Sequence, residues 1–173
     1  VFYQPKPFHK TVFYLTDEDK LKYSRYQAIA GLKQDIQDKY YENAETVSKS
    51  LAFIMKTQLI KRLESSFYAF KKSLGNFQTA TDRMIEMFEN DKVFIAPDTN
   101  VNKLLDKGWS EEDIEKEIER LSEENAKNQV FKSSDFKDDF LPLLKRDLEY
   151  IKELANEWKD IDYDPKMDVF IAQ

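Results

Sequence analysis

Six basic residues gather in one stretch of an otherwise acidic chain. The protein has 173 residues and a formal net charge of −6 at pH 7, yet residues 47–76 contain a single acidic residue, Glu64. The bases in this stretch are Lys49, Lys56, Lys61, Arg62, Lys71 and Lys72. Lysine and arginine bind phosphate groups through charge-assisted hydrogen bonds, so the acidic average does not exclude a polyanionic partner here. The candidate nucleic-acid-binding residues are Lys61, Arg62, Lys71 and Lys72.

Solubility and pairing with acidic neighbours explain the same bases equally well. The opposite charge gathers in residues 110–125, which contain eight acidic and two basic residues. An acidic run of this kind is usually a solvated helix face, and binding of a basic partner is the alternative.

The sequence lacks the residue patterns of common catalytic, nucleotide and metal sites. None of the three glycines is followed by the Lys-Ser or Lys-Thr of a phosphate-binding loop. There is no cysteine, and the only histidine, His9, has no ligand cluster around it. Ser65 and Ser66 beside Lys61 are similar to a serine–lysine nucleophile, but small hydroxyls at a close helix crossing are the preferred interpretation. We therefore predict no catalytic, cofactor or metal site in this chain.

An apolar stripe with helical spacing runs through the basic stretch. It consists of Phe53, Ile60, Leu63, Phe67, Phe70, Leu74, Phe77, Met84 and either Met87 or Phe88. Spacings of three and four residues place these side chains on one side of a helix. The stripe keeps its phase across Gly75, so we predict one long helix from about residue 47 to about residue 90, with a kink at Gly75 as the alternative.

Further helices are predicted on both sides of this one. Thr16 precedes three acidic residues and is a typical N-cap, so a helix is expected over about 17–41. Gly31 inside it predicts a close helix contact, because glycine costs about 1 kcal/mol relative to alanine. The last helix is expected to open at Ser133, with Pro142 in its first turn or at a kink. Its apolar stripe consists of Leu141, Leu144, Leu148, Ile151, Ala155 and Trp158.

The composition and the two stripes predict an all-α, elongated antiparallel helical bundle. Pro5 and Pro7 favour an extended N-terminal arm, with a short strand over 11–15. A loop or clip is expected over 91–109, and an acidic helix over 110–128 is expected at the side of the bundle. The predicted organisation is an arm over 1–16, a helical bundle over 17–162 and a linker over 163–173. Because no apolar run reaches the length of a membrane span, we expect a cytoplasmic chain without a membrane partner.

Residues 61–74, KRLESSFYAFKKSL, resemble the helical signature between the two RecA-like lobes of bacterial Swi/Snf-type superfamily 2 helicases. Residues 12–16, followed by Tyr23 and Tyr26, resemble the segment that leaves the first lobe. Residues 163–168 resemble the Asp-Pro-Lys approach to the second lobe. The resemblance thus brackets nearly the whole chain, whereas its middle part matches nothing.

The resemblance implies an inter-lobe region of an ATP-dependent nucleic-acid translocase. ATP and Mg²⁺ would bind in the flanking RecA-like lobes of the parent, because none of the motifs that bind them occurs here, and this chain alone is expected not to hydrolyse ATP. The helices would brace the lobes and contact the backbone of double-stranded DNA through the four candidate bases. The competing hypothesis is a free-standing, coiled-coil-like adaptor that binds a protein partner along an apolar stripe.

Overall fold

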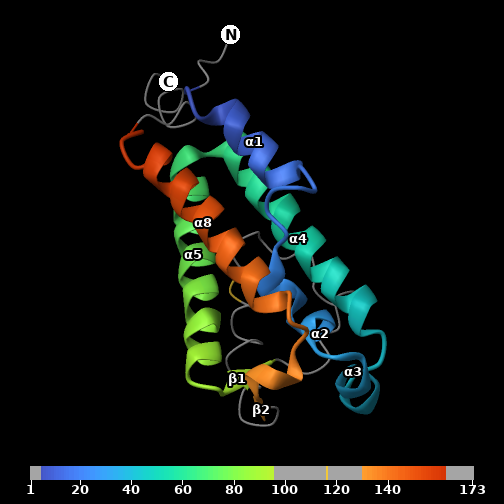
Figure 1. Ribbon diagram of the computed structural model, residues 1–173. Helices are drawn as coiled ribbons and strands as arrows, with labels where there is room; N and C mark the ends of the chain where they lie inside the picture. Colours follow the sequence, from blue (N-terminus) through green and yellow to red (C-terminus); the bar gives the residue numbers. More distant parts are fainter. Residues whose placement is uncertain (1–4, 96–115, 117–129, 163–173) are drawn as a thin grey trace.

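The computed structural model describes residues 5–95, 116 and 130–162 and shows an elongated, all-α bundle (Figure 1). The predicted fold class is confirmed. The predicted acidic helix over 110–128 lies outside the described residues, apart from Lys116, and so does the predicted linker over 163–173.

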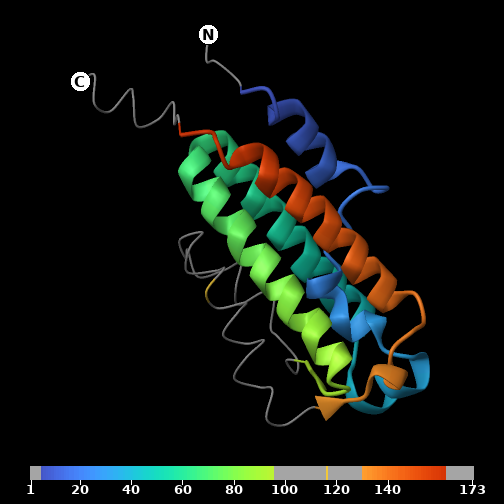
Figure 2. The ribbon, with the colours of Figure 1, turned by 60° about the vertical axis from the view of Figure 1, so that its left-hand side comes forward.

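Three long helices form the body of the bundle. Helices α4 (Ala44–Ser65) and α5 (Phe67–Glu89) are joined by a sharp corner and form a hairpin. Helix α8 (Phe140–Trp158) runs antiparallel to α5 and packs beside it along its length (Figures 1 and 2). The pairing of the two apolar stripes is therefore confirmed.

The N-terminal segment is a helix, so the predicted extended arm with a strand over 11–15 is wrong. Helix α1 spans Phe8–Thr16, and Pro7 is its N-cap. Proline is tolerated at a helix start, where its missing N–H would have no intrahelical partner. The buried side chains of α1 have helical rather than alternating spacing: Thr11, Tyr14 and Leu15.

The single helix predicted over 17–41 is replaced by three short elements. They are the 3₁₀ turn η1 (Ser24–Gln27), helix α2 (Ala28–Gly31) and helix α3 (Gln34–Tyr40). Tyr23 interrupts the helix because it adopts the left-handed conformation, with φ 56° and ψ 38°. This conformation is rare for a bulky side chain and is retained only where the surroundings hold it.

Tyr23 is held by buried contacts on two sides. Its hydroxyl donates a hydrogen bond of 2.7 Å to the carbonyl of Leu15 at the end of α1. Its ring stacks on Phe77 of α5, with centroids 5.7 Å apart and planes 7° apart. The tyrosine that breaks the predicted helix therefore joins α1 to the hairpin.

The long helix predicted over 47–90 is also wrong, because the chain reverses at Ser66. This residue is extended, with φ −159° and ψ 120°, and its hydroxyl accepts a hydrogen bond from the N–H of Ala69, capping α5. Gly75 lies inside α5 without a break, as predicted. The stripe is buried from Leu63 to Phe88, but Phe53 is 66% exposed.

The far end of the bundle is closed by a small clip. Strands β1 (Val93–Phe94) and β2 (Val130–Phe131) pair antiparallel. The short turn η3 (Ser133–Asp135) follows, so α8 begins at Phe140 rather than at Ser133. Pro142 lies in the first turn of α8, as predicted.

Two buried clusters make up the core. The cluster at the upper end of Figure 1 is built around Trp158, Phe70 and Phe77, and all three are at most 1% exposed. The cluster at the far end joins α2, the end of α5 and the start of α8.

Candidate functional site

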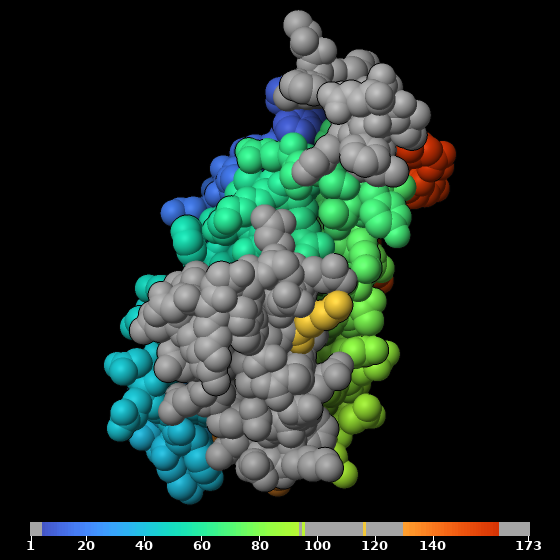
Figure 3. All heavy atoms as spheres, turned by 180° about the vertical axis from the view of Figure 1, so that it is seen from behind, coloured from blue at the N-terminus to red at the C-terminus, as the bar shows by residue number. Residues whose placement is uncertain are grey.

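The four bases predicted to bind phosphate are divided between two helices. Lys61 and Arg62 lie near the end of α4, whereas Lys71 and Lys72 lie near the start of α5. The reversal at Ser66 separates the two pairs. They therefore do not form the single basic edge expected from one straight helix. Seen from behind, α4 and α5 present adjacent green surfaces in the upper part of the molecule (Figure 3).

Of the four bases, one is buried and another binds backbone carbonyls. Arg62 is only 6% exposed. The ammonium of Lys71 donates to the carbonyls of Lys159 (3.4 Å) and Ile161 (3.1 Å), just beyond the end of α8. A cation at this position satisfies carbonyls that have no intrahelical partner and complements the helix dipole. Lys61 and Lys72 are the two bases of the set that are exposed.

Trp158, at the end of α8, contacts both the corner and α1. Its buried indole packs edge-on against Phe67 and Phe70 of α5, with both centroid distances 5.1 Å. The indole N–H donates a hydrogen bond of 2.7 Å to the hydroxyl of Thr11 in α1. Thr11 in turn donates to the carbonyl of Pro7 at 2.7 Å. Helices α1, α5 and α8 therefore meet at one side chain.

One face of α8 carries a row of side chains that bind residues 10–24. We call this row the α1–α8 ladder. Its members on α8 are Arg146, Asp147, Tyr150, Glu153, Glu157 and Trp158. Spacings of three and four residues align them along one side of the helix. The ladder was not predicted from the sequence, although its polar members show the same helical spacing as the apolar stripe beside them.

The upper rungs are formed by charged and hydroxyl groups. The ammonium of Lys10 donates to carboxylate oxygens of Glu153 (2.6 Å) and Glu157 (2.9 Å), and the hydroxyl of Tyr14 donates to Glu153 at 3.1 Å. The hydrogen bond from Lys10 holds the pKa of Glu153 below its ordinary value. The two carboxylates raise the pKa of Lys10 in return. Both shifts mean that the contact stabilises the charged forms of Lys10 and Glu153.

A cation on aromatic rings forms the middle rung. The ammonium of Lys20 lies 5.2 Å from the ring centroid of Tyr14, 5.3 Å from that of Tyr150 and 5.6 Å from that of Phe13. Distances under about 6 Å are typical of cation–π interactions. This lysine therefore joins the turn after α1 to the middle of α8.

The lowest rung is a buried carboxylate. Asp147 is 1% exposed and accepts hydrogen bonds of 2.8 Å from the backbone N–H groups of Lys22 and Ser24. Burial raises the pKa of this carboxyl, although the two N–H groups act in the opposite direction. Asp147 thereby holds the chain on both sides of Tyr23.

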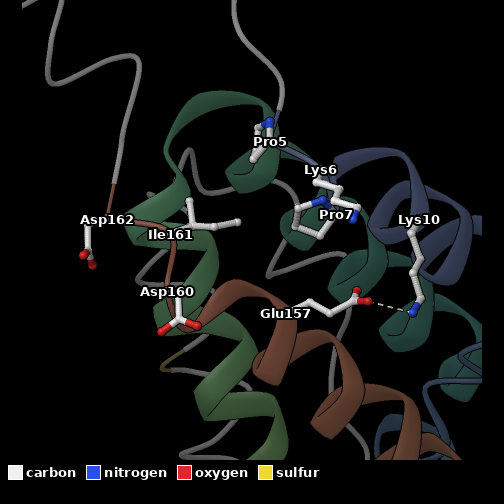
Figure 4. Close-up of a pocket in the computed structure, with 8 residues that line it drawn as sticks. All are labelled: Pro5, Lys6, Pro7, Lys10, Glu157, Asp160, Ile161 and Asp162. Atoms are coloured by element: carbon white, nitrogen blue, oxygen red, sulfur yellow. Dashed lines mark hydrogen bonds and ion pairs between the residues drawn. The ribbon is translucent and has the colours of Figure 1, made fainter.

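A notch of about 610 Å³ lies beside the upper rungs (Figure 4). Its lining consists of Pro5, Lys6, Pro7, Lys10, Glu157, Asp160, Ile161 and Asp162. Glu157 and Lys10 point toward one another across it, whereas Asp160 and Asp162 point away from Glu157 (Figure 4). Within the described residues, no group of three or more histidine, cysteine, aspartate or glutamate side chains is arranged to hold a metal ion.

The comparisons with known proteins leave the resemblance without independent support. The chain matches no protein-family model, no curated protein and no solved structure at a significant level. In the part of the chain that the structure describes, no helix is both long and apolar enough to cross a membrane.

Proposed function

We propose that this chain is the helical region between the two RecA-like lobes of a Swi/Snf-type nucleic-acid translocase, where it braces the lobes. One observation carries the proposal: Pro5 and Asp162, which lie before the first and after the last helix of the bundle, line the same notch (Figure 4). A helical unit with adjacent ends is suited to insertion between two parts of a larger fold. The corner at Ser66 lies at the same end of the molecule as this notch (Figure 1).

The structure of the corner supports the proposal. Residues 61–74 carry the resemblance, and three of them contact the end of α8 and the residues that follow it. Phe67 and Phe70 pack on Trp158, while Lys71 binds the carbonyls that follow α8. ATP and Mg²⁺ belong to the lobes in this proposal, and the role of the bundle is to fix where the lobes attach.

Contact with a DNA backbone is the second part of the proposal. Lys61 and Lys72 are exposed and flank the corner, so they would approach a duplex that the lobes hold. Phosphate contacts of this kind release counterions, and binding therefore weakens as salt rises. Arg62 and Lys71 are left out of this contact because the first is buried and the second binds carbonyls.

A protein adaptor is the competing function, and exposed aromatic side chains favour it. Phe53 on α4 is 66% exposed, and Tyr68 at the start of α5 is 73% exposed. Large exposed aromatic residues are enriched at protein interfaces. An adaptor would use these residues to bind a partner and would need neither of the exposed lysines.

Binding of a labelled DNA duplex across a salt series tests the DNA contact. We expect the double variant Lys61→Ala/Lys72→Ala to weaken binding and to lower the slope of log K against log salt by about two, since each phosphate contact contributes about 0.9. The control Lys145→Ala/Lys152→Ala removes the same charge from exposed positions on α8. Absence of binding at low salt, or equal loss in both variants, would reject the contact and favour the adaptor.

A further inference from the structure

We infer that the α1–α8 ladder joins α1 and α8 into one rigid strut, which fixes the start of α1 relative to the end of α8. The inference rests on the proposed function where it assigns the strut to coupling the two lobes. The rigidity itself is a property of this chain and can be measured without the lobes.

The ladder holds α1 and the turn after it at four levels along α8. From the upper end, Trp158 binds Thr11, two glutamates bind Lys10, Tyr150 contacts Lys20, and Asp147 binds two backbone N–H groups. The distance from Asp147 to Trp158 along the helix axis is about 16 Å at 1.5 Å per residue. Sliding or rotating α1 along α8 would break several of these contacts at once.

The first and last levels are buried, whereas the two levels between them are partly exposed. Trp158 and Thr11 are both 0% exposed, and Asp147 is 1% exposed. The side chains of Lys10 and Glu153 are 35% and 44% exposed. A buried donor or acceptor that loses its partner is costly, whereas exposed ion pairs contribute little to stability. The buried contacts therefore contribute most: Trp158 holds α1, and Asp147 holds residues 22–24. The partly exposed ion pairs add less.

A second attachment fixes the end of α8 to the hairpin. Lys71 of α5 binds the carbonyls of Lys159 and Ile161, so the residues after α8 are held by the corner. The strut and the corner together therefore prevent α1 and the residues after α8 from moving independently of each other. In a translocase, a rotation of one lobe would then be passed to the other through α1 and α8 as a unit.

The absence of cysteine in the sequence allows a direct measurement of this rigidity. Spin labels at His9→Cys on α1 and Lys145→Cys on α8 would mark exposed positions at different levels of the bundle. Lys10 binds Glu157, and Lys145 lies about 18 Å before Glu157 along α8 at 1.5 Å per residue. Double electron–electron resonance on this chain is expected to give one narrow distance distribution. Adding Thr11→Val and Lys10→Met should broaden it about twofold or more, because local opening becomes accessible when its contacts are removed. Asp147→Ala should broaden it further, unless this variant fails to fold.

Matched controls separate the ladder from general effects of substitution. Lys152→Met removes an exposed lysine from α8, and Thr16→Val removes the exposed hydroxyl at the end of α1. Both should leave the distribution narrow. A broad distribution in the doubly labelled parent, or an unchanged one in Thr11→Val/Lys10→Met, would overturn the inference.

Duplex binding by the same labelled proteins distinguishes the two proposals. A narrow distribution without DNA binding keeps the strut and removes the DNA contact of the proposed function. DNA binding with a broad distribution keeps that contact and removes the strut.

Discussion

The upper and far ends of the bundle are both packed with aromatic rings, and they differ in how hydrogen bonds complement that packing. At the far end, Phe136 stacks on Phe140 at a centroid distance of 5.3 Å and meets Phe88 at 4.7 Å. A β-carbon added to Gly31 would lie 2.3 Å from the ring of Phe140. The hydroxyl of Ser133 also donates there to the carbonyl of Phe88. At the upper end, by contrast, the hydrogen bonds join side chains of two helices, from Trp158 to Thr11 and from Lys10 to Glu153.

The difference predicts how each end responds to a substitution. Close-packed aromatic rings fix a structure by shape and leave no room for an added atom. Hydrogen bonds fix direction and register, and substituting one partner need not introduce a steric clash. At the upper end both act on one side chain, because Trp158 is packed between rings and also donates a hydrogen bond. Pro5 and Asp162 also lie at this end.

Trp158→Ala should have the largest effect on stability. The substitution removes a fully buried indole from between Phe67 and Phe70 and leaves Thr11 without its donor. We expect the free energy of unfolding to fall by about 3–5 kcal/mol, which urea or guanidinium denaturation would measure. Trp158→Phe should cost less because it keeps a ring. A loss below about 1 kcal/mol in the alanine variant would show that the junction is not tightly packed.

Gly31→Ala should have the next largest effect and tests the far end. We expect a loss of about 1–3 kcal/mol in the free energy of unfolding, because the new methyl group overlaps the ring of Phe140. Gly75→Ala is the matched control, since nothing lies within 4 Å of its added β-carbon. This control should stabilise α5 by about 0.5–1 kcal/mol.

A double-mutant cycle would identify the cause at Gly31. Phe140→Leu removes the ring that the methyl group meets, so its combination with Gly31→Ala should cost less than the sum of the two single changes. Simple additivity would mean that the methyl group acts on something other than this ring.

The apolar helix faces could be predicted from the sequence, whereas the chain reversals and the ladder could not. Leu144, Ile151 and Trp158 are all buried on the predicted side of α8. The corner at Ser66 was not predicted because Leu63 and Phe67 keep helical spacing across it, although they lie on two helices.

The N-terminal helix and the candidate bases show where sequence patterns are ambiguous. Residues 12–15 are apolar without interruption, so their spacing fits both a strand and a helix, and tertiary packing decides between them. Arg62 and Lys71 carry the same positive charge as Lys61. Only the three-dimensional structure shows that Arg62 is buried and that Lys71 binds carbonyls. The ladder depends on partners more than 120 residues apart in sequence, such as Asp147 and Lys22.

The pH dependence of stability should have the smallest effect, and it compares two carboxylates on the same helix. Glu153 has a lowered pKa because Lys10 binds its charged form, so its stabilising contribution should be present above the ordinary glutamate pKa of about 4 and be lost as pH falls through the lower folded value. Asp147 has a pKa raised by burial, so its contribution should be lost as pH rises from about 4 through the higher folded value. Denaturation of the parent, Glu153→Gln and Asp147→Asn between pH 3 and 8 would measure both differences. If stability changed with pH in the same direction at both residues, the Lys10 contact and burial would not shift the two pKa values in opposite directions.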